Sequence, residues 1–114
     1  MQLTFIQLSV FAAKWSRLKL TDEDLQALEA LLLENPQSGD VIPGAGGLRK
    51  VRFAPPRWRA GKRGALRVIY AFVAAGEAIY FFTVYGKTQQ SDLLPEEKKV
   101  FRDVLDRLTR MYRD

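Results

Sequence analysis

The segment 65–87, ALRVIYAFVAAGEAIYFFTVYGK, carries the strongest indication of the fold of this chain. It contains two runs rich in Val, Ile, Tyr and Phe, at residues 65–73 and 78–87, separated by a short connection that includes Gly76. β-Branched and aromatic residues in runs of this length are typical of strands, and a tight connection between two such runs indicates a hairpin. We therefore predict two neighbouring antiparallel strands here.

The segments on either side add further strands and helices. Apolar residues predict a first strand over 3–10, which we place at the centre of the sheet, and a second strand over 48–53. Helices are predicted over 11–18, from the capping residue Thr21 to Glu34, and from about Pro95 onward. The predicted fold class is α+β in the order β-α-α-β-β-β-α, with a mainly antiparallel sheet packed by helices. At 114 residues the chain is expected to form a single domain over 1–114.

Two helical stripes are expected to pack on the sheet because their apolar residues recur at spacings of three and four. In the second helix these residues are Leu25, Leu28, Leu31 and Leu32. In the last helix they are Val100, Phe101, Val104, Leu105, Leu108, Met111 and Tyr112. The glycines of the segment 43–47 precede a strand instead of opening a helix, so we interpret this segment as a turn and not as a phosphate loop.

The composition excludes several classes of protein. The chain has no cysteine and no histidine, so disulfides, zinc-thiolate sites, Ser-His-acid triads and histidine general bases are absent. The N-terminus does not resemble a signal peptide, and the longest apolar stretch is too short to span a membrane. We expect a soluble, cytoplasmic protein without a membrane partner.

Positive charge is confined to one part of the chain. The window 41–76 contains eight Lys and Arg residues and no acid, whereas the remaining ten Lys and Arg face all thirteen Asp and Glu. Concentrated positive charge attracts polyanions, and nucleic acid is the commonest partner of such a field. Solubilising charge on exposed strands is the alternative interpretation.

Strand periodicity predicts where these cations meet. Lys50 and Arg52 share one face of their strand, opposite to Val51 and Phe53. Arg67 interrupts an otherwise apolar strand, and the window 41–76 contains no acid that could pair with it. The last strand ends with Tyr85 and Lys87 on one face. If the strands pair in register, these cations and Tyr85 line one concave surface suited to phosphate.

The loop 55–64 supplies a second set of candidates for binding RNA. It contains Trp58 between two arginines, and this indole could stack on a base or anchor the loop. Together with one residue of the preceding strand, the predicted RNA-binding residues are Arg49, Arg57, Trp58, Arg59, Lys62 and Arg63.

Metal-independent cleavage of RNA suits these residues. A lysine beside other cations could help to activate a ribose 2′-hydroxyl, arginines could stabilise the charge of the phosphorane-like transition state, and a second cation or a tyrosine could assist the leaving 5′-oxygen. The predicted catalytic residues are Lys50, Arg52, Arg67, Tyr85 and Lys87. This chemistry requires neither a metal ion nor another cofactor.

Three blocks of the sequence resemble one known family. They are residues 35–52 (NPQSGDVIPGAGGLRKVR), 61–70 (GKRGALRVIY) and 83–87 (TVYGK). Together they resemble the RelE/ParE toxin superfamily, and specifically its HigB-like branch. The resemblance extends over nearly the whole chain and includes the order of the strands.

The resemblance implies a RelE-like fold and a type II toxin that cuts mRNA in the ribosomal decoding site and is held inactive by a cognate antitoxin. By position, Lys50 and Arg52 match paired basic residues of the family, Arg67 matches its phosphate-binding arginine, and Lys87 matches the basic residue at the end of the last strand. Two positions depart from RelE proper, because Thr88 replaces an arginine and Leu94 or a neighbour replaces a tyrosine. Tyr85 is the candidate substitute.

Two other functions stay open at this point. A ParE-like protein would inhibit DNA gyrase and cleave nothing, although that branch lacks the clustered catalytic cations. A non-catalytic RNA-binding module could use the same groove. The expected partners are therefore mRNA on the ribosome and an antitoxin, which we expect to be a small helix-turn-helix protein encoded beside the toxin.

Overall fold

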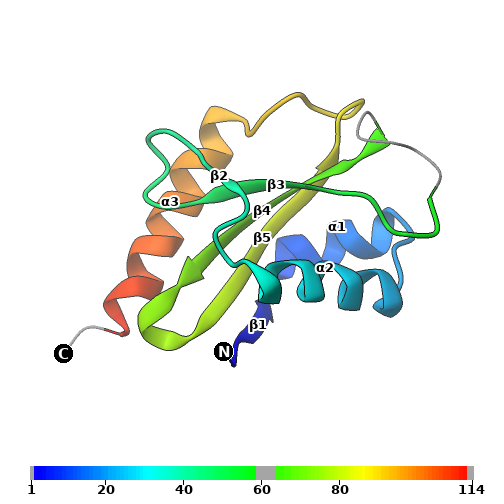
Figure 1. Cartoon of the computed structure of the whole chain (residues 1–114). Helices are drawn as coiled ribbons and strands as arrows, with labels where there is room; N and C mark the ends of the chain where they lie inside the picture. Colours follow the sequence, from blue (N-terminus) through cyan, green and yellow to red (C-terminus); the bar gives the residue numbers. More distant parts are fainter. Residues whose placement is uncertain (1, 59–63, 113–114) are drawn as a thin grey trace.

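The computed structural model describes residues 2–58 and 64–112. Its five-stranded sheet has the order β1-β5-β4-β3-β2 (Figure 1). The strands are β1 (Thr4–Gln7), β2 (Asp40–Val41), β3 (Arg49–Phe53), β4 (Leu66–Val73) and β5 (Ala78–Gly86). The helices are α1 (Ser9–Arg17), α2 (Asp22–Glu34) and α3 (Pro95–Arg110). The predicted α+β class is confirmed, and the two-residue β2 is an addition to the predicted order.

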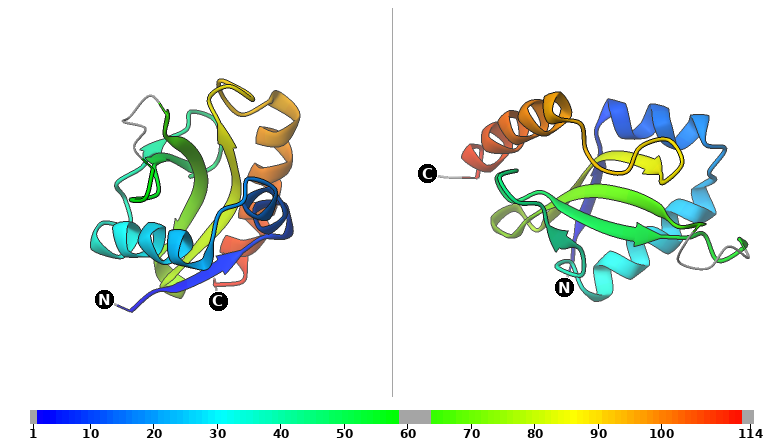
Figure 2. Two further views of the ribbon diagram at one scale, coloured as in Figure 1. Left: turned by 90° about the vertical axis from the view of Figure 1, so that its right-hand side faces the viewer. Right: turned by 90° about the horizontal axis from the view of Figure 1, so that it is seen from above.

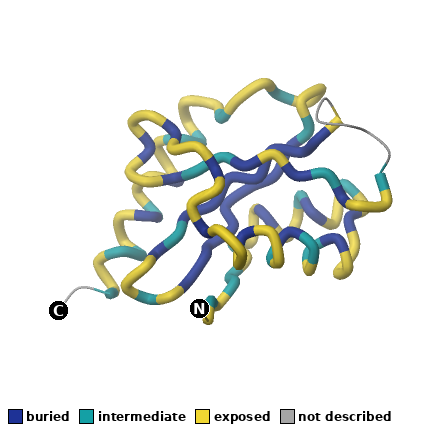
Figure 3. The backbone as a smooth tube through the Cα atoms, viewed as in Figure 1, coloured by how far each residue is buried: buried dark blue, intermediate teal, exposed yellow. Residues whose placement is uncertain are grey.

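The predicted hairpin of β4 and β5 forms the centre of the molecule. Its strands pair antiparallel through a turn of 3₁₀ helix, η2 (Ala74–Gly76), followed by Glu77 in the left-handed region at φ 48°. All residues of β4 except Phe72, and all residues of β5 except Gly86, are buried (Figure 3). The apolar runs that predicted strands are therefore buried on both faces of the sheet.

Two hydrophobic clusters cover the two faces of this sheet. On one face, Phe11 and Trp15 of α1 and Leu28 and Leu32 of α2 pack together against the strands. On the other face, α3 contributes Phe101 and Leu105 to the second cluster. Figure 2 shows α2 and α3 on opposite sides of the sheet.

The position of β1 corrects one prediction. β1 is an edge strand that pairs, in parallel, only with β5, and it ends at Gln7 because α1 begins at Ser9. Its apolar residues are partly buried on both faces of the sheet, since Phe5 packs against the first cluster and Ile6 packs against the second. A run of apolar residues therefore did not distinguish an edge strand with two covered faces from a central strand.

The helical stripes are confirmed in part. Leu28, Leu32, Phe101 and Leu105 are buried, as predicted. Three residues of the predicted stripes are exposed instead: Leu31, Val100 and Met111. Leu31 and Val100 lie at the margins of their stripes, whereas Met111 follows the last residue of α3.

The connection between β2 and β3 is a turn, as predicted. Gly44 and Gly46 have φ values of 71° and 70°, which side chains other than glycine rarely adopt. A Cβ atom at Gly46 would also come within 2.9 Å of Arg102 Cγ on α3. The turn thus lets the backbone approach the last helix closely.

No helix in the described residues is both long and apolar enough to cross a membrane.

Candidate functional site

Four of the predicted cations line one groove of about 910 Å³ on the α3 side of the sheet. Arg52 of β3 lies opposite Arg67 of β4, and Arg67 lies opposite Tyr85 of β5, so their side chains leave the same face. The lining residues are Ser38, Asp40, Lys50, Val51, Arg52, Ala54, Ala65, Arg67, Lys87 and Ser91. The structure therefore brings the four cations together, whereas the roles assigned to them stay predictions.

Arg67 is the most deeply placed of these cations. Its side chain extends from the middle strand of the sheet, is only 8% exposed, and donates from Nη1 to the carbonyl oxygen of Ala65 at 2.6 Å. Within the described part of the chain, Arg52, Arg67 and Lys87 have no carboxylate at ion-pair distance. A guanidinium carries five N–H donors, so Arg67 keeps donors for an anion in the groove.

Lys50 differs from the other three cations because it has an acidic partner. Its ammonium nitrogen lies 3.5 Å from Oδ1 of Asp92, in the segment that joins β5 to α3. The same carboxylate oxygen accepts a hydrogen bond from the backbone N–H of Leu93 at 2.8 Å. A fixed negative charge therefore stands beside the groove, in a place that phosphate could also occupy.

Tyr85 lies on the same face of the sheet as Arg67, but its hydroxyl is buried. It does not line the groove, and the hydroxyl has no hydrogen-bond partner among the described residues. Burial, with the negative charges of Asp92 and Glu97, raises the pKa of Tyr85 to about 12 although Arg67 acts to lower it. The phenol stays protonated near neutral pH, so any catalytic role would be that of a proton donor.

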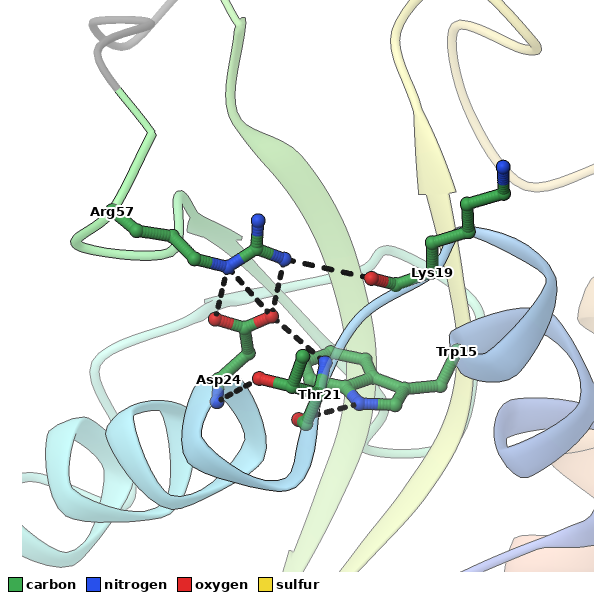
Figure 4. Close-up of polar contacts among 5 residues, drawn as sticks. All are labelled: Trp15, Lys19, Thr21, Asp24 and Arg57. Atoms are coloured by element: carbon green, nitrogen blue, oxygen red, sulfur yellow. Dashed lines mark hydrogen bonds and ion pairs between the residues drawn. The ribbon is translucent and has the colours of Figure 1, made fainter.

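Arg57 is held by a carboxylate on the opposite side of the sheet from α3. Its Nε and Nη2 donate to Asp24 at 3.0 and 2.7 Å, and Nη2 lies 3.5 Å from the carbonyl oxygen of Lys19 (Figure 4). Asp24 is only 3% exposed and belongs to a capping box with Thr21 at the start of α2. The hydrogen bond from Arg57 is the main reason why the pKa of Asp24 falls to about 2. This cluster fixes the start of the loop that follows β3.

The other predicted RNA-binding residues either do not line the groove or lie outside the described residues. Arg49 points to the other face of β3, where Nη1 donates to the carbonyl oxygens of Gln37 and Gly39 at 3.2 and 2.8 Å. Trp58 is partly buried and packs against the cluster of α1 and α2. Arg59, Lys62 and Arg63 lie outside the residues that the structure describes.

Several polar residues of the groove were not predicted from the sequence. Ser38, Asp40 and Ser91 line it, and Asp92 pairs with Lys50. Asp40 is opposite Lys50 in the pairing of β2 with β3, but β2 is too short to show a periodic pattern. Asp92 follows β5 closely, and the only signal in the sequence was that an acid comes a few residues after Lys87. Among the described residues, no group of three Asp or Glu side chains could hold a metal ion.

The architecture of this chain is similar to that of a solved toxin structure. No family model matches the chain. Among solved structures, the chain is similar to the Escherichia coli toxin RelE, in a double arginine-to-alanine variant in the free state. The TM-score is 0.55 at 15% sequence identity, and the match covers 80% of this chain and 90% of that chain. The chain thus has a RelE-like fold.

Proposed function

We propose that this chain is the toxin of a type II toxin-antitoxin system and cleaves mRNA on the ribosome. The observation that carries the proposal is the convergence of Lys50, Arg52, Arg67 and Lys87 on one groove of a RelE-like fold. Three of these cations have no acidic partner in the described residues, and such a site is complementary to the phosphates of a nucleic acid. The resemblance of the sequence blocks supports assignment to the HigB-like branch and a place of action in the cytoplasm.

The reaction we propose is an in-line transfer at phosphorus. The ribose 2′-oxygen forms a bond to phosphorus while the bond from phosphorus to the 5′-oxygen breaks, which gives a 2′,3′-cyclic phosphate and a 5′-hydroxyl end. Arg52 and Arg67 stabilise the additional negative charge of the transition state. Of Lys50 and Lys87, one helps to remove the proton of the 2′-hydroxyl and the other assists the departing 5′-oxygen. A requirement for the 2′-hydroxyl restricts the activity to RNA.

The proposal is tested by inducing the gene in a bacterium and mapping the 5′ ends of cellular mRNA. We expect growth arrest, with new ends inside translated regions that carry a 5′-hydroxyl. Purified protein should leave the supercoiling activity of DNA gyrase unchanged. Growth arrest with intact mRNA and inhibited gyrase would overturn the proposal in favour of a ParE-like function. Binding of RNA without any cleavage would indicate a non-catalytic RNA-binding module.

The same groove suggests how an antitoxin would act. A surface with free cations would bind ribosomal RNA broadly, so a partner of opposite charge that covers the groove or displaces α3 would inhibit it. Association should then slow markedly as ionic strength rises, because salt screens charges beyond about 8 Å at physiological concentration. Stopped-flow association at several salt concentrations measures this, with the product of the adjacent small reading frame as the partner. A rate that is indifferent to salt would place the antitoxin on another surface.

A further inference from the structure

A second hollow adjoins the groove where β4 begins and β5 ends. This recess has a volume of about 260 Å³, and its walls include Leu18, Trp58, Leu66, Gly86, Lys87 and Gln89. Ala65 and Lys87 line both the recess and the groove, so the two hollows share a wall. The groove lies on the α3 side of the sheet, whereas Leu18, Trp58 and Leu66 of the recess belong to the α1 and α2 side. A ligand with a phosphate in the groove would therefore reach the recess by passing around the end of the sheet at Lys87.

The chemistry of the recess differs from that of the groove. Leu18, Leu66 and the indole of Trp58 give it apolar walls, and among the described residues that line it only Lys87 is charged. Gln89 uses its amide oxygen to accept the backbone N–H of Gly86 at 2.9 Å, which leaves its amide N–H₂ as a donor. An aromatic face, apolar walls and a single amide donor beside a cation are complementary to a planar heterocycle attached to a phosphate.

Trp58 is not the sole anchor of this part of the chain. The preceding residue, Arg57, already fixes this part of the chain through its hydrogen bonds to Asp24 and its contact with Lys19 (Figure 4). A turn closed by the backbone N–H of Trp58 and the carbonyl oxygen of Pro55 at 2.8 Å then fixes the main chain from which the indole extends. The indole is only partly buried, and its N–H makes no hydrogen bond within the described residues. Part of a rigidly placed aromatic side chain thus stays accessible at the recess.

We propose that this recess binds the base of the nucleotide next to the phosphate held in the groove. The inference rests on the proposed function, because it names a subsite of the same RNA. The base stacks on Trp58, and Gln89 donates to its edge while Lys87 contacts the backbone between the two hollows. Since a base must leave its own stack to enter, the recess selects single-stranded RNA over a duplex.

The test compares two oligonucleotides on matched proteins. One is a 2′-O-methyl hexa-adenylate, which cannot be cleaved by attack of a 2′-hydroxyl, and the other has the same backbone without bases. We expect the wild-type protein to bind the adenylate about 5- to 150-fold more tightly than the abasic strand, the range found for stacking on one aromatic side chain. In Trp58→Leu this ratio should fall close to one, whereas Trp58→Phe should keep part of it. The ratio of the two affinities does not depend on how much of a variant is folded, because both strands bind the same folded fraction.

Fluorescence gives an independent measurement in the variant Trp15→Phe, in which Trp58 is the only tryptophan. The adenylate should quench this fluorescence and the abasic strand should not. An unchanged ratio in Trp58→Leu together with intact mRNA cleavage would overturn the recess and leave the proposed function standing. If the wild-type protein neither binds the adenylate nor cleaves mRNA, the proposed function is overturned and the recess with it.

Discussion

Two groups of cations, all but Lys87 from the basic window 41–76, have different surroundings in the structure. Arg52, Arg67 and Lys87 line the groove and have no carboxylate partner among the described residues. Arg49 and Arg57 instead donate to main-chain carbonyls and to the buried carboxylate of Asp24. We assign anion binding to the first group, whereas the second group holds loops and the start of a helix in place.

Local charge density in the sequence therefore does not identify a binding residue. Arg49 and Lys50 are adjacent in β3, yet they extend from opposite faces of the sheet, and only Lys50 lines the groove. The partner of Arg57 is 33 positions away in the sequence. A mutation in the first group should therefore change cleavage, whereas a mutation in the second group should change stability.

The largest expected effect comes from the lysines of the groove. Lys50→Ala and Lys87→Ala should each lower the rate of mRNA cleavage on ribosomes about a hundredfold or more, the size expected when a group in proton transfer is lost. Because both act in one step, the double variant should lose little more than the worse single variant. Single-turnover cleavage separates the steps, since weaker binding with an unchanged rate at saturation would make both lysines phosphate ligands only.

Asp24→Ala should have its main effect on stability. The change removes one half of the capping box and the charged hydrogen bonds from Arg57, which together stabilise by about 1–3 kcal/mol. Urea unfolding measures the loss, and cleavage by the folded fraction should stay within a few fold of wild type. A large loss of cleavage without a loss of stability would show that the second group of cations belongs to the site.

The pH dependence of stability should carry the signature of the same carboxyl. Asp24 has a folded pKa of about 2 against an ordinary value of 3.8, so its ionised form stabilises the fold above that ordinary value. The contribution is lost as the pH falls from 3.8 toward 2. Unfolding of wild type and Asp24→Asn should therefore differ at pH 5 and converge near pH 2, and a constant difference across this range would contradict the assignment.

The sequence predicted the fold better than it predicted the surroundings of each side chain. The β4–β5 hairpin, the three helices and the shared face of Lys50 and Arg52 followed from local patterns, because periodicity is a property of neighbouring residues. The edge position of β1, the partner of Arg57 and the carboxylate beside Lys50 depend on contacts between residues distant in sequence. No local pattern reports such contacts.

Asp92→Asn should have a smaller effect, and in the opposite direction to the lysine variants. Removing the carboxylate frees Lys50 for phosphate, so single-stranded RNA should bind about two- to fivefold more tightly, as befits an exposed ion pair. The matched control is Asp106→Asn, which breaks the pair with Arg110 on α3 away from the groove and should leave RNA binding unchanged. Weaker binding in Asp92→Asn would indicate that Asp92 positions Lys50 instead of competing with phosphate.

The smallest effect is expected from Tyr85→Phe. The hydroxyl that it removes is buried without a partner in the described residues, so the variant should be as stable as wild type or slightly more stable. Because Tyr85 does not line the groove, we expect cleavage to stay close to that of wild type. A larger loss at unchanged stability would identify Tyr85 as the proton donor to the leaving 5′-oxygen.

We propose that the cations of the groove, and not the whole basic window, cut mRNA. This is tested most directly by cleavage of mRNA on purified ribosomes with Arg67→Ala and Arg57→Ala, each corrected for its folded fraction. Both variants lose one arginine from the same charged window, so they have equal net charge. We predict that Arg67→Ala loses cleavage about a hundredfold or more, the effect of removing a group that stabilises transition-state charge, while Arg57→Ala keeps cleavage within a few fold. Equal losses in the two variants, or full activity in a folded Arg67→Ala protein, would contradict the account.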